Sequence, residues 1–242
     1  MIELGKIQKL EVVREKTFGV YLAEGSGEAA SVLLPKKQVP SGIKIGDSIT
    51  VFIYKDSEDR LIATTETPRL QVGETAVLTV KDVSRIGAFL DMGLEKDLLL
   101  PFKEQSHPVK KGEECLVALY VDKSSRLAAT MRVYHYMSNQ SPYQKDDKVR
   151  GRIYEINENL GAFVAVDNRY YGLIPKKEIF QDLREGEEVE ARVLKVREDG
   201  KLDLSLRDKA YIQMAADSEK VMKVIEEFDG VLPFNDKARP ET

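Results

Sequence analysis

The chain has 242 residues with a hydrophobic content of 42%, and its 37 basic and 41 acidic side chains give a formal net charge of −4. This balance excludes a uniformly cationic polyanion binder, so any nucleic-acid site would have to be a local patch. The single cysteine, Cys115, excludes an intramolecular disulfide and favours a reducing cytoplasm. The longest apolar run, 115–121, is far shorter than the roughly twenty residues of a membrane-spanning helix, so we expect no membrane partner.

Three sets of anchor residues recur along the chain. Apolar runs end at Pro35, Pro101 and Pro175, and a glycine followed by an acid comes eleven residues after each proline. Upstream of each proline stands a glycine, then a small residue, then an aromatic ring. These three rings are Tyr21, Phe89 and Phe163. The shared register predicts three tandem copies of about 66 to 75 residues, rather than the one or two domains that length alone suggests.

The third copy has the pattern of a small all-β unit. Five segments have the composition or alternation of short strands: 149–153, 163–166, 170–174, 189–196 and 202–206. Asp199 and Gly200 supply the positive φ of a tight turn before the last of them. A short helical turn within 176–184 would complete the plan of an OB-type barrel, which inserts a helical segment after its third strand.

We therefore expect a mainly β protein of three tandem S1-type OB-fold barrels of five strands, followed by a short α-helical tail. The expected domains are 1–68, 71–135, 145–210 and the tail 211–242. The linker 65–72 is short, whereas 132–147 is longer and more polar, so the first two copies should form a compact pair and the third should move more freely. The ring cluster 134–136 should pack this second linker against the second copy.

The tail carries the apolar stripe of an amphipathic helix. Val221, Val224, Ile225 and Phe228 fall at i, i+3, i+4 and i+7. Pro240 followed by an acid is typical of the first turn of another helix. We expect this stripe to dock on the third copy or to belong to a further domain.

The third copy resembles an S1 RNA-binding domain. The residues that carry the resemblance are Val149, Gly151 and Ile153, the run 161–164, the run 172–174, Gly186, Glu187 and Val189, and the closing run 202–206. The first two copies share the assignment through their register. The whole chain, with its tail 228–237, is similar to the conserved virulence factor B family of bacterial proteins, which carries three S1 domains and a C-terminal winged helix. The resemblance implies RNA binding, a regulatory role, no catalysis and a truncated winged helix.

The resemblance also implies an RNA face on strands two and three and on the turn between strands four and five. The stacking platforms would be Tyr21, Phe89 and Phe163. Phe18 matches a second ring that precedes the strand-two glycine. The basic positions of the turns would be Arg60, Arg126 and Lys201. Prolines 35, 101 and 175 stand where the family usually has a histidine.

Rings and cations suit single-stranded RNA, because an exposed ring stacks on any base while Lys and Arg follow the phosphates. The third copy adds further candidates of both kinds: Arg152, Tyr170, Tyr171, Lys176 and Lys177. Neighbours on a strand point to opposite sides, so one of Tyr170 and Tyr171 must face outward. The alternatives are purely structural roles. Phe89 and Phe163 would be core residues, Arg60 and Arg126 would pair with the nearby acid of their own turns, and the lysine pairs would be solvated surface residues with no ligand.

The sequence lacks the groups of residues that would indicate an enzyme. His107 and His135 are the only histidines of the sequence, so we expect no metal cluster, and Cys115 should be buried and inert. We therefore expect a cytoplasmic, non-catalytic regulator that binds single-stranded RNA and needs no cofactor. The alternatives are a protein-interaction scaffold whose barrels have lost RNA binding, and a DNA-binding regulator that acts through a complete winged helix.

Overall fold

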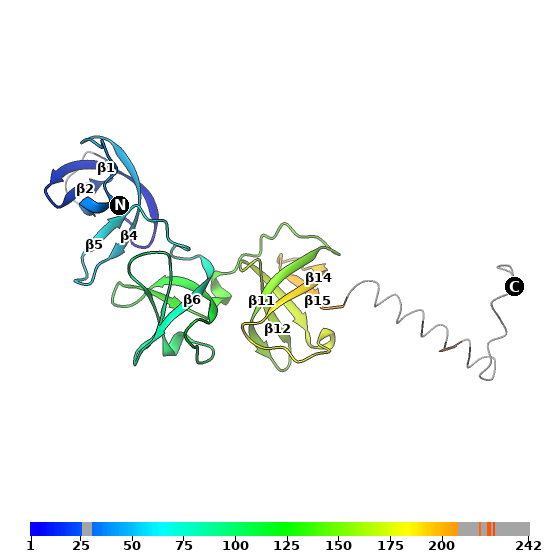
Figure 1. Ribbon diagram of the computed structural model, residues 1–242. Coiled ribbons are helices and arrows are strands. Elements are labelled where there is room, and N and C mark those ends of the chain that lie inside the picture. The colour runs from blue at the N-terminus through cyan, green and yellow to red at the C-terminus, as the bar shows by residue number, and fades with distance from the viewer. Residues whose placement is uncertain (26–30, 208–217, 219–221, 224, 226–242) are drawn as a thin grey trace.

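The computed structural model describes residues 1–25, 31–207, 218, 222, 223 and 225. In this part of the chain, strands β1 to β15 form three consecutive five-stranded units (Figure 1). The expected helix and winged helix of the tail, 211–242, fall almost wholly outside the described residues. Within those residues, no helix is long and apolar enough to cross a membrane.

The first unit, which we call barrel one, closes in the strand order β1-β2-β3-β5-β4. Its strands are β1 (Ile7–Lys16), β2 (Gly19–Ala23), β3 (Ser31–Pro35), β4 (Ser48–Lys55) and β5 (Leu61–Thr64). All neighbours run antiparallel except β3 and β5, which pair in parallel. A bulge between Val12 and Arg14 bends β1, which lets this one strand pair with both β2 and β4.

The second and third units repeat this plan. Barrel two has the strand order β10-β9-β6-β7-β8, and barrel three closes in the order β11-β12-β13-β15-β14. The strands of barrel two are β6 (Thr75–Val83), β7 (Gly87–Leu90), β8 (Leu98–Pro101), β9 (Glu114–Val121) and β10 (Leu127–Thr130). Those of barrel three are β11 (Lys148–Asn157), β12 (Gly161–Val166), β13 (Tyr170–Pro175), β14 (Glu188–Val196) and β15 (Leu202–Ser205). The mainly β fold of three five-stranded barrels is thus confirmed.

Each repeated proline ends the third strand of its barrel and opens a single 3-10 turn. Pro35, Pro101 and Pro175 have φ of −60°, −61° and −59°, close to the value that the proline ring imposes. The turns that follow are η1 (Lys36–Gln38), η2 (Phe102–Glu104) and η4 (Lys176–Glu178). The helical turn expected within 176–184 is therefore present but short.

The repeated glycines are required by close contact between the second and third strands. Gly19, Gly87 and Gly161 have φ of +153°, +151° and +123°. A Cβ at these positions would lie 2.0 to 2.2 Å from the carbonyl oxygen of Leu34, Leu100 or Ile174. A side chain does not fit at that distance, so this anchor of the repeat is a packing requirement.

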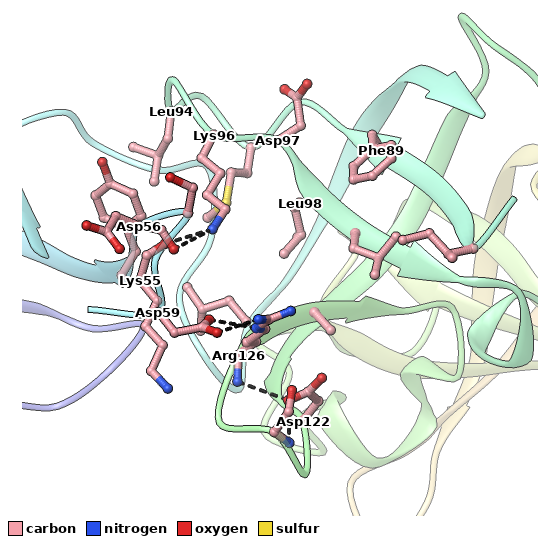
Figure 2. Close-up of a pocket in the computed structure, with 18 residues that line it drawn as sticks. Lys55, Asp56, Asp59, Phe89, Leu94, Lys96, Asp97, Leu98, Asp122 and Arg126 are labelled. Atoms are coloured by element: carbon pink, nitrogen blue, oxygen red, sulfur yellow. Dashed lines mark hydrogen bonds and ion pairs between the residues drawn. The ribbon is translucent and has the colours of Figure 1, made fainter. Parts of the chain in front are cut away.

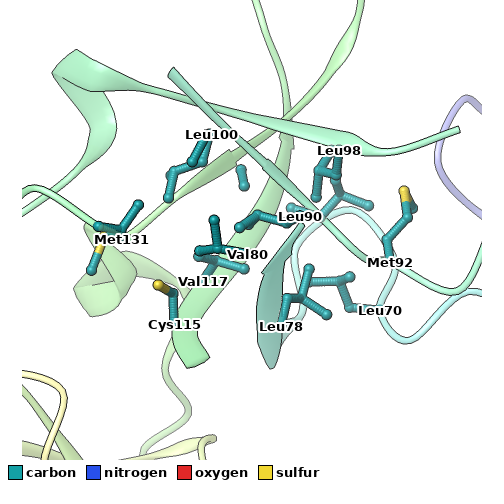
Figure 3. Packing of buried hydrophobic residues seen from close by; sticks show 14 of the residues in the cluster. Leu70, Leu78, Val80, Leu90, Met92, Leu98, Leu100, Cys115, Val117 and Met131 are labelled. Atoms are coloured by element: carbon teal, nitrogen blue, oxygen red, sulfur yellow. The ribbon is translucent and has the colours of Figure 1, made fainter. Parts of the chain in front are cut away.

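The first two barrels pack together as expected. Phe52 of β4 and Leu70 of the linker are buried in the same apolar cluster as Leu90 and Leu98 of barrel two, and Figure 3 shows Leu70 beside Leu78 and Leu90. Because a residue of barrel one completes the core of barrel two, the two barrels form one compact pair.

The second linker packs against both barrel two and barrel three, which the sequence pattern did not predict, while the expected greater freedom of barrel three stays a prediction. The turn η3 (Val133–Tyr136) opens the second linker, and Val133 and Met137 are buried between Leu116 of barrel two and Tyr154 of barrel three. The polar residues of the linker come after the buried Val133 and Met137 in the sequence, so they do not separate the two barrels. The expected role of 134–136 in packing the linker is confirmed, although these residues contact barrel three as well.

Candidate nucleic-acid interface

Barrel one presents an aromatic ring under a cation on its outer surface. Val20 and Leu22 of β2 point into the core, so the intervening Tyr21 faces outward. Arg14 of β1 is the cross-strand partner of Tyr21, and its guanidinium lies 4.3 Å from the ring centroid. The bulge just before Arg14 sets the register that brings the two side chains together.

A second ring stands beside this pair. Phe18 lies in the turn between β1 and β2 and is 54% exposed. Its ring is edge-on to that of Tyr21, with centroids 6.3 Å apart. The structure therefore brings together two of the rings predicted from the sequence, together with an arginine that the sequence reasoning missed.

The turn between β4 and β5 adds Arg60 to this surface. Arg60 Nε and Nη2 donate to Asp56 Oδ2 at 2.9 and 2.7 Å, and the N–H groups of Glu58 and Arg60 donate to Asp56 Oδ1. Desolvation alone would raise the pKa of Asp56, but these hydrogen bonds outweigh it and hold the pKa below its ordinary value. Arg60 thus clamps its turn, and its side chain stays mostly exposed. Hydrogen bonding to Asp56 is the main cause of the raised pKa of Arg60, and Tyr21 lies near enough to add slightly to it.

In barrel two the corresponding arginine reaches across to barrel one. Asp122 accepts hydrogen bonds from backbone N–H groups of its own turn, as Asp56 does, but Arg126 turns its guanidinium to Asp59 instead. Nε donates to Asp59 Oδ1 at 2.7 Å and Nη2 donates to Oδ2. Phe89, the expected platform, is half-buried in the same region (Figure 2).

We call the surface of barrel one that is formed by Arg14, Phe18, Tyr21 and Arg60 the barrel-one face.

In barrel three the expected platform is covered by the chain itself. The ring of Phe163 contacts those of Tyr134 and Tyr154, with centroids 6.5 and 6.1 Å apart. Tyr134 comes from η3, outside barrel three. The expectation that Phe163 could face solvent is therefore corrected, since the linker folds back over it.

The two adjacent tyrosines of β13 point to opposite sides, as expected. Tyr170 packs against the core of barrel three and stands edge-on to Tyr143. Tyr171 points outward but contacts Tyr134, with centroids 5.1 Å apart, and Lys201 Nζ lies 5.3 Å from the centroid of its ring. Both the outward ring and the turn lysine of barrel three are thus engaged with the linker or with each other.

Arg152 bridges two barrels rather than facing solvent. Its side chain is only 13% exposed, Nη1 donates to the carbonyl of Gly186 at 2.6 Å, and Nη2 lies 3.6 Å from a carboxylate oxygen of Glu114 in barrel two. This placement argues against the predicted RNA contact, because phosphate would have to displace these partners. Lys176 and Lys177 are exposed on η4, away from the rings of barrel one.

Two family models match the chain. An S1 domain model matches residues 4–66 and 72–132, and a model of the second domain of the virulence regulatory factor CvfB matches residues 134–208. Together with the three OB barrels, these matches define a protein built from S1 domains.

Curated relatives align with nearly the whole chain. The uncharacterized protein YitL of Bacillus subtilis is 29% identical over 247 residues, which cover 98% of this chain and 81% of the relative. Conserved virulence factor B of Staphylococcus saprophyticus is 25% identical over 247 residues, covering 98% and 82%. The chain belongs to the conserved virulence factor B family, as the sequence resemblance implies.

A solved structure shares the fold. The crystal structure of a multidomain protein with nucleic acid binding domains from Streptococcus pneumoniae aligns with 98% of this chain and 86% of its own, with a TM-score of 0.53 and 21% sequence identity. At this identity the likeness concerns the fold alone.

Proposed function

We propose that the protein is a non-catalytic regulator that binds single-stranded RNA, and that the barrel-one face is its main contact. The observation that carries the proposal is the exposed ring of Phe18 beside Tyr21, with the Arg14 guanidinium over the Tyr21 ring. Membership in a family of S1-domain virulence regulators supports the regulatory role. The nucleic acid binding domains described for the Streptococcus pneumoniae protein agree with it.

The chemistry of the barrel-one face suits an unpaired strand. Single-stranded RNA exposes both faces of its bases, and each base can stack on an aromatic ring or on a guanidinium plane. Phe18 offers an open ring, and Arg14 offers a guanidinium plane held by Tyr21. Arg60 is paired with Asp56 and Glu58, but its side chain is 67% exposed and adds an accessible positive charge beside this surface. Because the chain is acidic overall, binding should be local and weakened by salt.

The proposal is tested by removing one exposed ring at a time. Phe18→Ala should weaken binding of a fluorescent single-stranded RNA oligomer by roughly tenfold, the order expected when one base loses its stacking partner. Phe102→Ala is the matched control, because Phe102 is 51% exposed but lies on η2 of barrel two. Equal affinity of Phe18→Ala and the wild type would contradict the proposed contact.

Two further measurements test the preference for RNA over DNA and the absence of catalysis. DNA oligomers of the same sequence should bind more weakly if 2′-hydroxyls contribute, whereas equal binding would favour general single-strand recognition. RNA that is incubated with the protein should keep its length, because we propose no catalytic step. Shortened RNA products would contradict the non-catalytic role.

The main alternative is a protein-interaction scaffold with degenerate S1 domains. The observation that favours it is the coverage of Phe163 and Tyr171 by Tyr134, which closes the corresponding surface of barrel three. This coverage leaves the barrel-one face open, so we rank RNA binding first. An absence of RNA binding at low salt would favour the scaffold. DNA binding through a winged helix concerns the tail, which lies outside the described residues.

A further inference from the structure

A pocket of about 290 Å³ lies between barrels one and two. Figure 2 shows the β4–β5 turn of barrel one, with Asp56 and Asp59, facing Phe89, Leu98 and Arg126 of barrel two. The pocket therefore exists only while the two barrels are paired. Its size is near the lower end of the range for small-molecule sites in proteins, which suits a single flat ring system better than a larger ligand.

The apolar part of the pocket is contributed mainly by barrel two. Phe89 and Leu99 are opposite each other on the paired strands β7 and β8, and Ile86, which is 60% exposed, extends this wall. Tyr54 of β4 lies among the lining residues from barrel one. Such a wall makes contact with the faces of a planar ring.

The charged part of the pocket disfavours a bare phosphate. Three cationic side chains and four carboxylates line it: Lys55, Lys96, Arg126, Asp56, Asp59, Asp97 and Asp122. The carboxylates outnumber the cations, so an anion placed inside would meet net repulsion. Carboxylate oxygens and Lys or Arg donors can instead hydrogen-bond the edge of a neutral ring.

The wall supplied by barrel one is held in place by cross-barrel bonds. Arg126 binds both carboxylate oxygens of Asp59, and Lys96 Nζ donates to the carbonyl oxygens of Lys55 and Asp56 at 3.0 Å each. Four bonds from two side chains of barrel two therefore fix a turn of barrel one at the pocket. A preformed wall lowers the cost of ordering the site when a ligand binds.

We propose that this pocket receives one base of the bound RNA, turned out of its stack and placed between the two barrels. The inference rests on the proposed function and deepens it, because it makes barrels one and two a single binding unit. Arg60 and Asp59 belong to the same turn, so an RNA strand that crosses the barrel-one face reaches the pocket over that turn. The ring of Phe89 then contacts the inserted base rather than a base on an open surface.

The experiment fills the pocket without touching the core of either barrel. Ser57 is exposed and lines the pocket, so Ser57→Trp places a large ring where the base would enter. The matched control is Glu58→Trp, which puts the same ring on the next residue, outside the lining residues. The control also removes a negative charge and the carboxylate that pairs with Arg60 Nη1, and both changes by themselves would strengthen RNA binding rather than weaken it. Both variants and the wild type are titrated with one RNA oligomer, after denaturation curves confirm that they are equally folded.

We expect Ser57→Trp to bind the oligomer roughly tenfold more weakly than the wild type, the order expected for one lost base contact, and Glu58→Trp to bind at least as tightly. Binding by the wild type with no loss in Ser57→Trp would overturn the pocket inference and leave the proposed function standing. Equal losses in the two variants would also overturn it, because bulk on the turn would then be the cause. Absence of binding by the wild type would overturn both proposals.

Discussion

The ring of Tyr134 stands edge-on against the ring of Phe163, with centroids 6.5 Å apart and planes at 89°. Tyr134 belongs to η3 after barrel two, whereas Phe163 occupies the platform position of barrel three. Tyr171 contacts Tyr134 as well. A segment of the chain thus covers, on barrel three, the ring that the sequence predicts as a stacking platform.

This relationship predicts a structural role for Tyr134. Tyr134→Ala should lower the free energy of unfolding by about 1–3 kcal/mol, because the variant loses the ring contacts with Phe163 and Tyr171 and uncovers both. Urea denaturation measures the loss. Tyr134→Phe keeps the ring and should stay close to the wild type. A Tyr134→Ala variant as stable as the wild type would show that the ring cluster does not hold barrels two and three together.

The ion pair between Asp59 and Arg126 predicts a pH response at the junction of barrels one and two. Hydrogen bonds from Arg126 are the main reason why the pKa of Asp59 lies below its ordinary value. A lowered folded-state pKa stabilises the fold above the ordinary value, about 3.9, and this contribution disappears as the pH falls through the folded-state pKa. In Arg126→Gln the pKa of Asp59, followed by carboxyl NMR, should rise toward its ordinary value.

The matched control for this measurement is Arg60→Gln, which removes the side-chain partner of Asp56 and leaves the Asp59 pair intact. In that variant the pKa of Asp56 should rise while that of Asp59 stays low. Because the guanidinium of each pair is more than half exposed, added salt should weaken both pairs. An Asp59 pKa that is the same in Arg126→Gln and the wild type would contradict the cross-barrel pairing.

The close contacts of the repeated glycines predict unequal costs for substituting them by alanine. At Gly161 a Cβ would lie 2.0 Å from the carbonyl oxygen of Ile174, whereas at Gly186 no atom lies within 4 Å and only the φ of +86° opposes a side chain. Gly186→Ala should cost about 1–2 kcal/mol of stability for the left-handed backbone conformation. Gly161→Ala should cost clearly more, since strands β12 and β13 must also separate. Denaturant midpoints of the two variants give the comparison, and equal midpoints would contradict it.

The repeated anchors were predictable because each is a local geometric requirement. Pro35 fixes the φ with which its strand ends, and Gly19 allows close strand contact, so residue type and spacing alone predicted three barrels. Alternation predicted in the same way that one of Tyr170 and Tyr171 faces outward, and the structure shows that it is Tyr171. The tail lies almost wholly outside the described residues, so its expected helix stays a prediction.

The contacts between barrels could not be predicted from such patterns. Arg126 pairs with Asp59, 67 residues away, although Asp122 stands four residues before it in the sequence. Arg152 and Phe163 were both candidates for RNA contact, but the burial of Val133 between the barrels places both at a junction. The docking of one barrel on another depends on side-chain fit and has no period in the sequence. The open barrel-one face was therefore found only from the structure, although its two rings were predicted.

Burial of Cys115 predicts an unreactive thiol in the folded protein. Cys115 is 2% exposed within the core of barrel two, and burial raises the pKa of its thiol to about 12. The thiolate is the reactive form, so at pH 8 both the protonation state and the lack of access oppose reaction. A disulfide reagent should therefore modify the native protein far more slowly than the urea-unfolded protein, whose thiol ionises near its ordinary pKa of about 8.5. If the native protein reacts as fast as the unfolded one at pH 8, barrel two must open often enough to expose β9, and the apolar cluster that it shares with Phe52 cannot be the stable core described here.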